Sequence, residues 1–169
     1  MKVVLPPEIA IEDTARRLQN GGQVVAKRTR VITENAPPPY TTATLLQDAV
    51  ARLGWSGRQV MEVAQELFEQ GLITYPRTDS IHIAQEAERL AKEFLRQTYG
   101  HRRFSLWPKR RNGHGAHEAI RPTDPRTTPE VVETTAQGQL LYRLIWQRFL
   151  ASYMPPAKIR VIEIEVEVP

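Results

Sequence analysis

The middle of the chain alternates apolar and polar residues with the period of an α-helix. Capping residues and glycines mark the ends of four predicted helices: one from Thr41 or Thr42 to Gly54, one from Ser56 to Gly71, and two over residues 83–99 and 140–154. The apolar face of the second helix is predicted to include Leu67 and Phe68. The first two helices and the extended stretch after them resemble a helix-turn-helix followed by a strand, an arrangement found in DNA-binding domains and also in ordinary cores.

Stretches with β-strand patterns flank this helical middle. Residues 24–32 are rich in β-branched side chains, and residues 159–168 alternate apolar residues with glutamate, as a half-exposed strand does. A short strand at residues 2–5 and a helix at residues 8–18 are predicted before them. Prolines at 37–39 and 155–156 separate the two kinds of structure, because proline can neither continue a sheet nor enter a helix interior.

We therefore predict an α+β fold, mostly α, in which a helical domain is inserted in a small β-rich segment. The predicted boundaries are residues 1–37 and 157–169 for the β-rich segment and residues 38–156 for the helical domain. The final strand lacks partners that should follow it, so we expect the chain to be part of a longer polypeptide.

The composition is that of an ordinary globular protein. The 169 residues are 41% hydrophobic, which is enough to form a core, and the net charge of +4 permits a polyanionic partner without requiring one. The absence of cysteine excludes disulfides and cysteine-ligated zinc and favours a reducing compartment. With no signal peptide or apolar stretch of membrane-spanning length, we expect a cytoplasmic monomer with no membrane partner.

Positive charge is concentrated between Arg96 and Arg121. This stretch holds seven basic residues and a single acidic one, Glu118, and Phe104 and Trp107 lie among them. Mixed cationic and aromatic surface is what single-stranded nucleic acid binds, although most basic runs are only solvated surface. Two adjacent members of the run are candidate DNA contacts, Arg110 and Arg111.

The stretch from Gly71 to Ser80 carries the strongest candidate chemistry. If the chain stays extended through Pro76, Tyr75 and Arg77 project to the same side, because side chains alternate along an extended chain. A phenol, with an ordinary pKa of about 10, needs nearby positive charge to act as a nucleophile, and arginine also binds phosphoryl oxygens with two parallel bonds. The pair therefore indicates attack on a phosphodiester. The alternative is a tyrosine that covers the edge of the core beside a solvated turn.

The stretch from residue 116 to residue 123 adds two further candidates, His117 and Arg121. They are four residues apart, so they share a face if this piece is helical, whereas an irregular loop would only gather them. Both are candidate phosphate contacts, and both are also ordinary surface residue types. Thr78, in the polar cluster after Arg77, is a further candidate contact.

Three segments taken in order resemble the type IA DNA topoisomerases, which include bacterial topoisomerase I, topoisomerase III and reverse gyrase. The segments are Pro38-Pro39-Tyr40-Thr41-Thr42-Ala43-Thr44-Leu45-Leu46, residues 71–80, and residues 116–123. The resemblance covers essentially the whole chain. It implies that residues 38–156 form the winged-helix-like helical domain that bears the active-site tyrosine, and that the flanking residues belong to the β-rich arch that this domain interrupts.

The resemblance also implies a mechanism and a set of partners. Tyr75 would attack a phosphodiester of single-stranded DNA, leaving a 5′-phosphotyrosine link and a free 3′-hydroxyl, and religation after strand passage would need no ATP. Arg77 matches the arginine that holds the scissile phosphate, His117 a histidine near it, and Arg121 a contact to the DNA backbone. Family members also use Mg²⁺ bound by a separate Toprim domain, and no Asp-x-Asp-x-Glu segment occurs here. We therefore expect this chain to depend on the remaining topoisomerase domains, to bind no metal itself, and to cleave poorly alone.

Two hypotheses from other classes stay open on the residues alone. A non-enzymatic winged-helix module would bind duplex DNA and would not need the Tyr75 hydroxyl. A domain that serves only as a hinge or arch would bind DNA weakly, and a salt titration of binding separates it from the other two.

Overall fold

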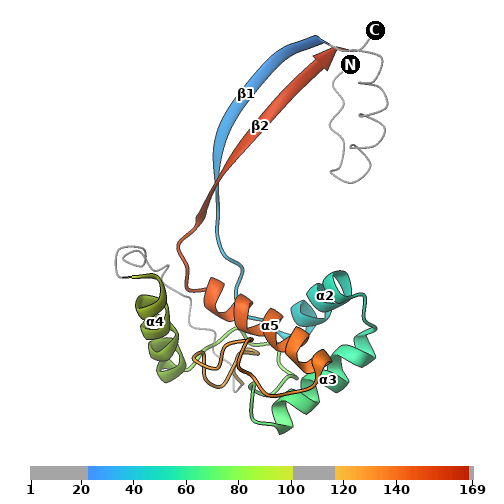
Figure 1. Ribbon diagram of the computed structural model, residues 1–169, viewed down its shortest axis with the longest axis vertical. Helices are drawn as coiled ribbons and strands as arrows, with labels where there is room; N and C mark the ends of the chain where they lie inside the picture. Colours follow the sequence, from blue (N-terminus) through green and yellow to red (C-terminus); the bar gives the residue numbers. More distant parts are fainter. Residues whose placement is uncertain (1–22, 101–116, 168–169) are drawn as a thin grey trace. The chain divides into compact units, whose positions relative to one another are not determined.

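The computed structural model describes residues 23–100 and 117–167, and it confirms an α+β, mostly helical fold (Figure 1). The described elements are β1 (Gln23–Glu34), α2 (Thr42–Leu53), α3 (Gly57–Glu69), α4 (Gln85–Tyr99), α5 (Ala136–Ala151) and β2 (Ala157–Glu167). The strand predicted at residues 2–5, the helix predicted at 8–18 and the basic loop at 101–115 lie outside the described residues.

The chain divides into two compact units. Residues 35–156 form one unit, here called the helical unit, and the two flanking stretches form the other. The described part of the second unit is an antiparallel ribbon of β1 and β2, which runs in register from Gln23 opposite Glu167 to Glu34 opposite Ala157 (Figure 1). One irregularity interrupts the ladder between Val24 and Ala26. Both strands confirm the β patterns of the sequence.

The ends of α2 and α3 follow from their capping residues. The Thr41 hydroxyl accepts the backbone N–H of Thr44 and forms a capping box with it, and Gly54 closes α2 in the left-handed conformation, with φ of 69°. Ser56 caps α3 by accepting the backbone N–H of Gln59. These helix ends confirm the prediction, because each cap satisfies backbone groups that the helix itself leaves unpaired.

Three local predictions need correction. Helix α4 begins at Gln85 instead of residue 83, and α5 spans Ala136–Ala151 instead of residues 140–154, because Thr135 caps it early by accepting the Gly138 N–H. After α3 the chain makes an isolated bridge, Ile73 opposite Pro122, instead of a strand. In the described part of the helical unit, strand-like pairing is confined to isolated bridges.

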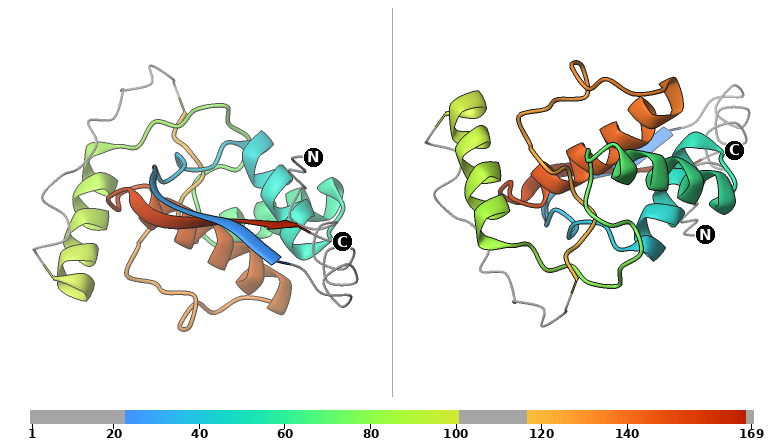
Figure 2. Two further views of the ribbon diagram at one scale, coloured as in Figure 1. Left: turned by 90° about the horizontal axis from the view of Figure 1, so that it is seen from above. Right: turned by 90° about the horizontal axis from the view of Figure 1, so that it is seen from below.

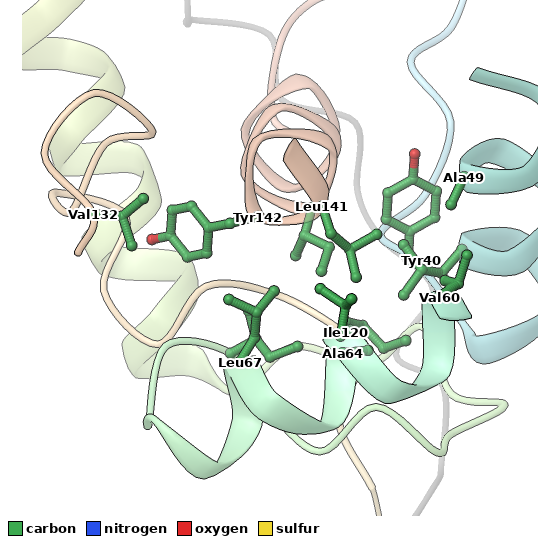
Figure 3. Close-up of a cluster of buried hydrophobic side chains, with 13 residues drawn as sticks. Tyr40, Ala49, Val60, Ala64, Leu67, Ile120, Val132, Leu141 and Tyr142 are labelled. Carbon is green, nitrogen blue, oxygen red and sulfur yellow. The ribbon is translucent and has the colours of Figure 1, made fainter. Parts of the chain in front are cut away.

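The core of the helical unit surrounds α5, which lies between α4 and the α2–α3 pair (Figure 2). One cluster packs α5 against α2 and α3, and it includes Leu45, Ala64, Leu67, Ile120, Leu141 and Ile145 (Figure 3). A second cluster joins α4 to the C-terminal half of α5, through Ala91, Leu95, Phe149 and Leu150. Apart from Leu150 and the non-helical Ile120, these residues lie on the faces that the helical periodicity predicts to be buried.

A polar network fixes the beginning of the helical unit to the end of α5. The Arg148 Nε donates to the backbone oxygen of Pro38 at 2.7 Å, and its NH1 lies 3.3 Å from the Asp48 carboxylate. The same carboxylate accepts the Tyr40 hydroxyl at 2.6 Å, while the Arg148 guanidinium lies 4.7 Å from the centre of the Tyr40 ring. The segment that enters α2 is thereby held in place.

Candidate active site

The structure brings the three sequence motifs together around residues 119–123. This stretch bridges Tyr40 through Ile120 and bridges Ile73 through Pro122, both in the antiparallel sense. It therefore lies between the segment that leads into α2 and the segment that follows α3. Motifs separated by tens of residues in the sequence form one continuous backbone arrangement within the helical unit.

Thr74 connects two of these motifs directly. Its backbone N–H donates to the Arg121 oxygen at 2.9 Å, and its hydroxyl accepts the Arg121 N–H at 3.0 Å. The hydroxyl also donates to the Ala119 oxygen at 2.7 Å. Because Tyr75 is the next residue, the candidate nucleophile is fixed beside the stretch that carries His117 and Arg121.

Burial alternates along the loop after Thr74. Tyr75 is 43% exposed and Arg77 is exposed, whereas Pro76 between them is buried and Thr78 is only 7% exposed. This alternation is the pattern of an extended chain, in which Tyr75 and Arg77 face the same side. Within the described residues Arg77 has no ion pair and the Tyr75 hydroxyl no hydrogen bond, so both functional groups are open to a ligand.

The Tyr75 ring packs against Phe68 at the end of α3. The ring centroids are 5.3 Å apart and the planes meet at 69°, which is an edge-to-face contact. Helical periodicity assigns Phe68 to the buried face of α3, but Phe68 is exposed and faces this loop. Since an edge-to-face pair prefers particular ring orientations, Phe68 orients the Tyr75 ring, and the Tyr75 hydroxyl stays accessible.

Arg121 points into the protein in this structure. Its side chain is 11% exposed and its NH2 lies 2.6 Å from the Glu118 carboxylate, which is 28% exposed. A second nitrogen, NH1, donates to the Pro122 oxygen at 3.0 Å. Its guanidinium is therefore satisfied internally, and a contact between Arg121 and DNA stays a prediction.

Glu118 is a structural residue that sequence reasoning missed. Its carboxylate binds Arg121 and also accepts the Ala84 N–H at 2.6 Å, which places an acceptor at the start of α4. Burial alone would raise the pKa of Glu118, but the bonds from Arg121 and from the Ala84 backbone outweigh burial and hold the pKa below its ordinary value. The available signal was its position as the single acid in a basic stretch.

The remaining predicted contacts lie in different environments. His117 is exposed, and residues 117–120 are not helical, so the two residues at 117 and 121 do not share a helix face. Thr78 is buried and its hydroxyl accepts the Ser80 N–H at 3.0 Å. Arg110 and Arg111 lie outside the described residues. For all four residues, DNA binding stays a prediction.

The described residues offer no metal site and no membrane segment. No group of three or more His, Asp or Glu side chains among them is arranged to hold a metal ion. The described helices are likewise too short or too polar to cross a bilayer.

An accessible phenol and an accessible guanidinium, two residues apart, thus lie on a backbone arrangement that joins the three motifs. A family model described as DNA topoisomerase matches residues 8–169. The chain is 44% identical to the reverse gyrase of Pyrococcus furiosus over 137 residues, and 38% identical to DNA topoisomerase 1 of Synechococcus elongatus over 152 residues. The chain belongs to the type IA DNA topoisomerase family.

The similarity extends to a solved structure but covers only part of each relative. The full-length topoisomerase I of Thermotoga maritima superposes with a TM-score of 0.71 at 32% identity, over 93% of this chain and 27% of that one. The Pyrococcus alignment covers 74% of this chain and 11% of the relative, and the Synechococcus alignment covers 86% and 17%. The chain thus corresponds to a small part of these much longer proteins.

Proposed function

We propose that this chain is the part of a type IA DNA topoisomerase that carries the nucleophile, Tyr75. The observation that carries the proposal is the exposed pair of Tyr75 and Arg77, held by Thr74 against the stretch that bears His117. The helical unit then corresponds to the tyrosine domain, and the β1–β2 ribbon belongs to the interrupted arch. The protein acts on single-stranded DNA in the cytoplasm, as a monomer associated with the nucleoid.

The proposed reaction is a reversible transesterification. The Tyr75 oxygen bonds to the scissile phosphorus, the phenolic proton leaves, and the bond from phosphorus to the 3′-oxygen breaks. The departing 3′-oxygen takes a proton and becomes a free hydroxyl, while the other DNA end stays attached to Tyr75 through its 5′-phosphate. Attack by the same hydroxyl after strand passage reverses every bond change, so the reaction needs no ATP.

Arg77 and His117 are proposed to assist the transfer by binding the scissile phosphate. Arg77 has no acidic partner among the described residues, so its guanidinium is available to a phosphoryl oxygen, where negative charge builds up during the transfer. His117 is exposed on the adjoining stretch and contributes a further contact near that phosphate. Arg110, Arg111 and Thr78 are proposed contacts along the strand, and Arg121 joins them if it exchanges Glu118 for a phosphate.

The complete enzyme is proposed to supply Mg²⁺ from a domain outside this chain. Mg²⁺ would be bound by a Toprim domain supplied by the remaining topoisomerase domains, where it would help to position the phosphate and neutralise its charge. We therefore expect this chain alone to bind single-stranded DNA but to cleave it poorly.

The test is detection of a covalent protein–DNA adduct on a denaturing gel. The complete topoisomerase that contains this chain is incubated with single-stranded DNA labelled at either end, in the presence of Mg²⁺. Because the proposed link is to the 5′-phosphate, a 3′-end label should travel with the protein and a 5′-end label should not. Tyr75→Phe should abolish the adduct while keeping the ring against Phe68.

Tyr99→Phe is the matched control, because Tyr99 is the second exposed tyrosine of the described helical unit, with 48% of its surface exposed. This variant should form the adduct normally. An adduct that survives Tyr75→Phe, or an enzyme that forms none, would favour the non-enzymatic DNA-binding module instead.

A further inference from the structure

The geometry points to Thr42, at the start of α2, as a positioning residue for the loop that carries Tyr75 and Arg77. The inference rests on the proposed function, which it extends to a residue that would act by holding the loop and not by touching the reacting atoms. Thr42 acts through the backbone on both sides of Arg77. Its hydroxyl and its N–H bind Pro76 and Thr78, which are 34 and 36 residues away in the sequence.

The contact between Thr42 and Thr78 is reciprocal. The Thr42 N–H donates to the Thr78 oxygen at 2.8 Å, and the Thr78 N–H donates to the Thr42 hydroxyl at 2.8 Å. The two residues thus exchange hydrogen bonds as paired strand residues do, except that a side chain replaces one backbone oxygen. The backbone after Arg77 is fixed to the first turn of α2.

The hydroxyl proton of Thr42 fixes the other side of Arg77. The Pro76 oxygen lies 2.7 Å from the Thr42 hydroxyl and the Thr78 oxygen lies 3.0 Å from it. A hydroxyl has one proton to donate, and the Thr78 oxygen already accepts the Thr42 N–H, so the shorter bond to Pro76 takes the proton. One side chain therefore pins both peptide groups that flank Arg77.

Helix α2 does not need the Thr42 hydroxyl for its own formation. Thr41 caps the helix, and Thr44 completes the capping box. The Thr42 hydroxyl binds the Tyr75 loop and takes no part in the capping box, so its role is separate from helix capping. Thr44, whose hydroxyl bonds only to Thr41 among the described residues, provides a matched control on the same helix.

Loss of this contact should affect the chemical step more than DNA binding. Tyr75 and Arg77 must meet one phosphate together, and a small displacement of reacting groups costs up to about 100-fold in rate. Thr42→Val keeps the branched shape and removes the hydroxyl, which leaves the Pro76 oxygen and the Thr78 N–H without this partner. Thr42→Ser keeps the hydroxyl and should restore the function.

The experiment measures single-turnover adduct formation by the complete topoisomerase with saturating single-stranded DNA. Thr42→Val should slow adduct formation about 10- to 100-fold with little change in the Kd for DNA, while Thr42→Ser and Thr44→Val stay near the unaltered rate. An unaltered rate for Thr42→Val overturns the inference. An equal loss in Thr44→Val, or no rescue by Thr42→Ser, also overturns it, because the effect would then come from the helix end.

Amide hydrogen exchange of this chain separates failure of the inference from failure of the proposed function. Exchange at the Thr78 N–H should accelerate at least about tenfold in Thr42→Val and stay slow in Thr42→Ser. Unchanged Thr78 protection in Thr42→Val overturns the contact, whatever the enzyme does. Accelerated exchange together with no adduct from the unaltered enzyme supports the contact and overturns the proposed function.

Discussion

One isoleucine of the helical unit and one of the β1–β2 ribbon lie in opposite environments. Ile145 of α5 is completely buried in the core, whereas Ile164 of β2 is 57% exposed. One ion pair of each unit shows the same contrast, since Arg121 and Glu118 are largely buried and Arg30 and Glu163 of the ribbon are 64% and 52% exposed. The helical unit is therefore stabilised by burial of side chains, and the described ribbon mainly by its backbone ladder.

The largest expected effect follows from truncating each isoleucine in turn. Ile145→Ala should lower the free energy of unfolding of the helical unit by about 2–5 kcal/mol, because it leaves a cavity in the core. Ile164→Ala should cost less than about 1 kcal/mol, because the side chain already contacts water. Chemical denaturation followed by circular dichroism measures the first, and amide exchange in the strands measures the second. Equal costs would mean that Ile164 is covered in solution.

A second prediction concerns alkaline pH and belongs to the helical unit, since neither strand contains tyrosine. Burial raises the pKa of Tyr40, helped by its bond to Asp48, and burial also raises the pKa of Tyr142. Each tyrosine stays protonated in the folded state after it has ionised in the unfolded state. Their stabilisation is therefore complete below the ordinary tyrosine pKa of about 10 and decreases above it by about 1.4 kcal/mol per pH unit for each tyrosine.

Denaturation of this chain at pH values from 8 to about 11.5 tests this slope. Tyr142→Phe should remove one tyrosine's share of the decrease, although it also removes a hydroxyl that donates to the Thr127 oxygen at 2.7 Å. The comparison is therefore between slopes, not between absolute stabilities. A variant with an unchanged slope would contradict the burial of an un-ionised phenol at this position.

The smallest expected effects distinguish the two ion pairs. Glu118→Gln should lower the free energy of unfolding by about 1–2 kcal/mol, because it weakens the bond to the mostly buried Arg121. Glu163→Gln should cost at most about 0.5 kcal/mol, because both partners in that pair are hydrated. Denaturation of both variants at neutral pH gives the comparison.

Acidification provides the control for the Glu118 prediction. Since the folded state lowers the pKa of Glu118, its stabilisation is present above the ordinary glutamate pKa and is lost as the pH falls through and below that value. The difference between the unaltered chain and Glu118→Gln should therefore shrink in acid. A difference that is independent of pH would show that the carboxylate charge is not responsible.

The helix ends show how far local sequence reasoning extends. Thr41, Gly54 and Ser56 fix the ends of α2 and α3 through neighbours within four residues, and these ends were predictable. The start of α4 was not, because its N-terminal Ala84 N–H binds the carboxylate of Glu118, 34 residues away. No pattern within the helix itself indicates that partner.

The candidate site likewise has features that the sequence predicts and features that it does not. The sequence identifies Tyr75 and Arg77 by residue type, spacing and motif, and their exposure on one side follows from an extended chain through Pro76. It does not indicate that the Arg121 guanidinium is paired with Glu118, nor that Phe68 turns from the helix face to the Tyr75 ring. Both depend on which segments the fold brings side by side.

The sequence by itself determined the helices, the strands, most of their ends and the residue types at the candidate site. These features depend on periodicity, caps and prolines, which act over a few residues. Only the tertiary structure decided which motif contacts which, how Thr42 and Thr74 hold the Tyr75 loop, and which charges are exposed. The physical reason is that hydrogen bonds and burial between distant segments exist only after the core has packed around α5.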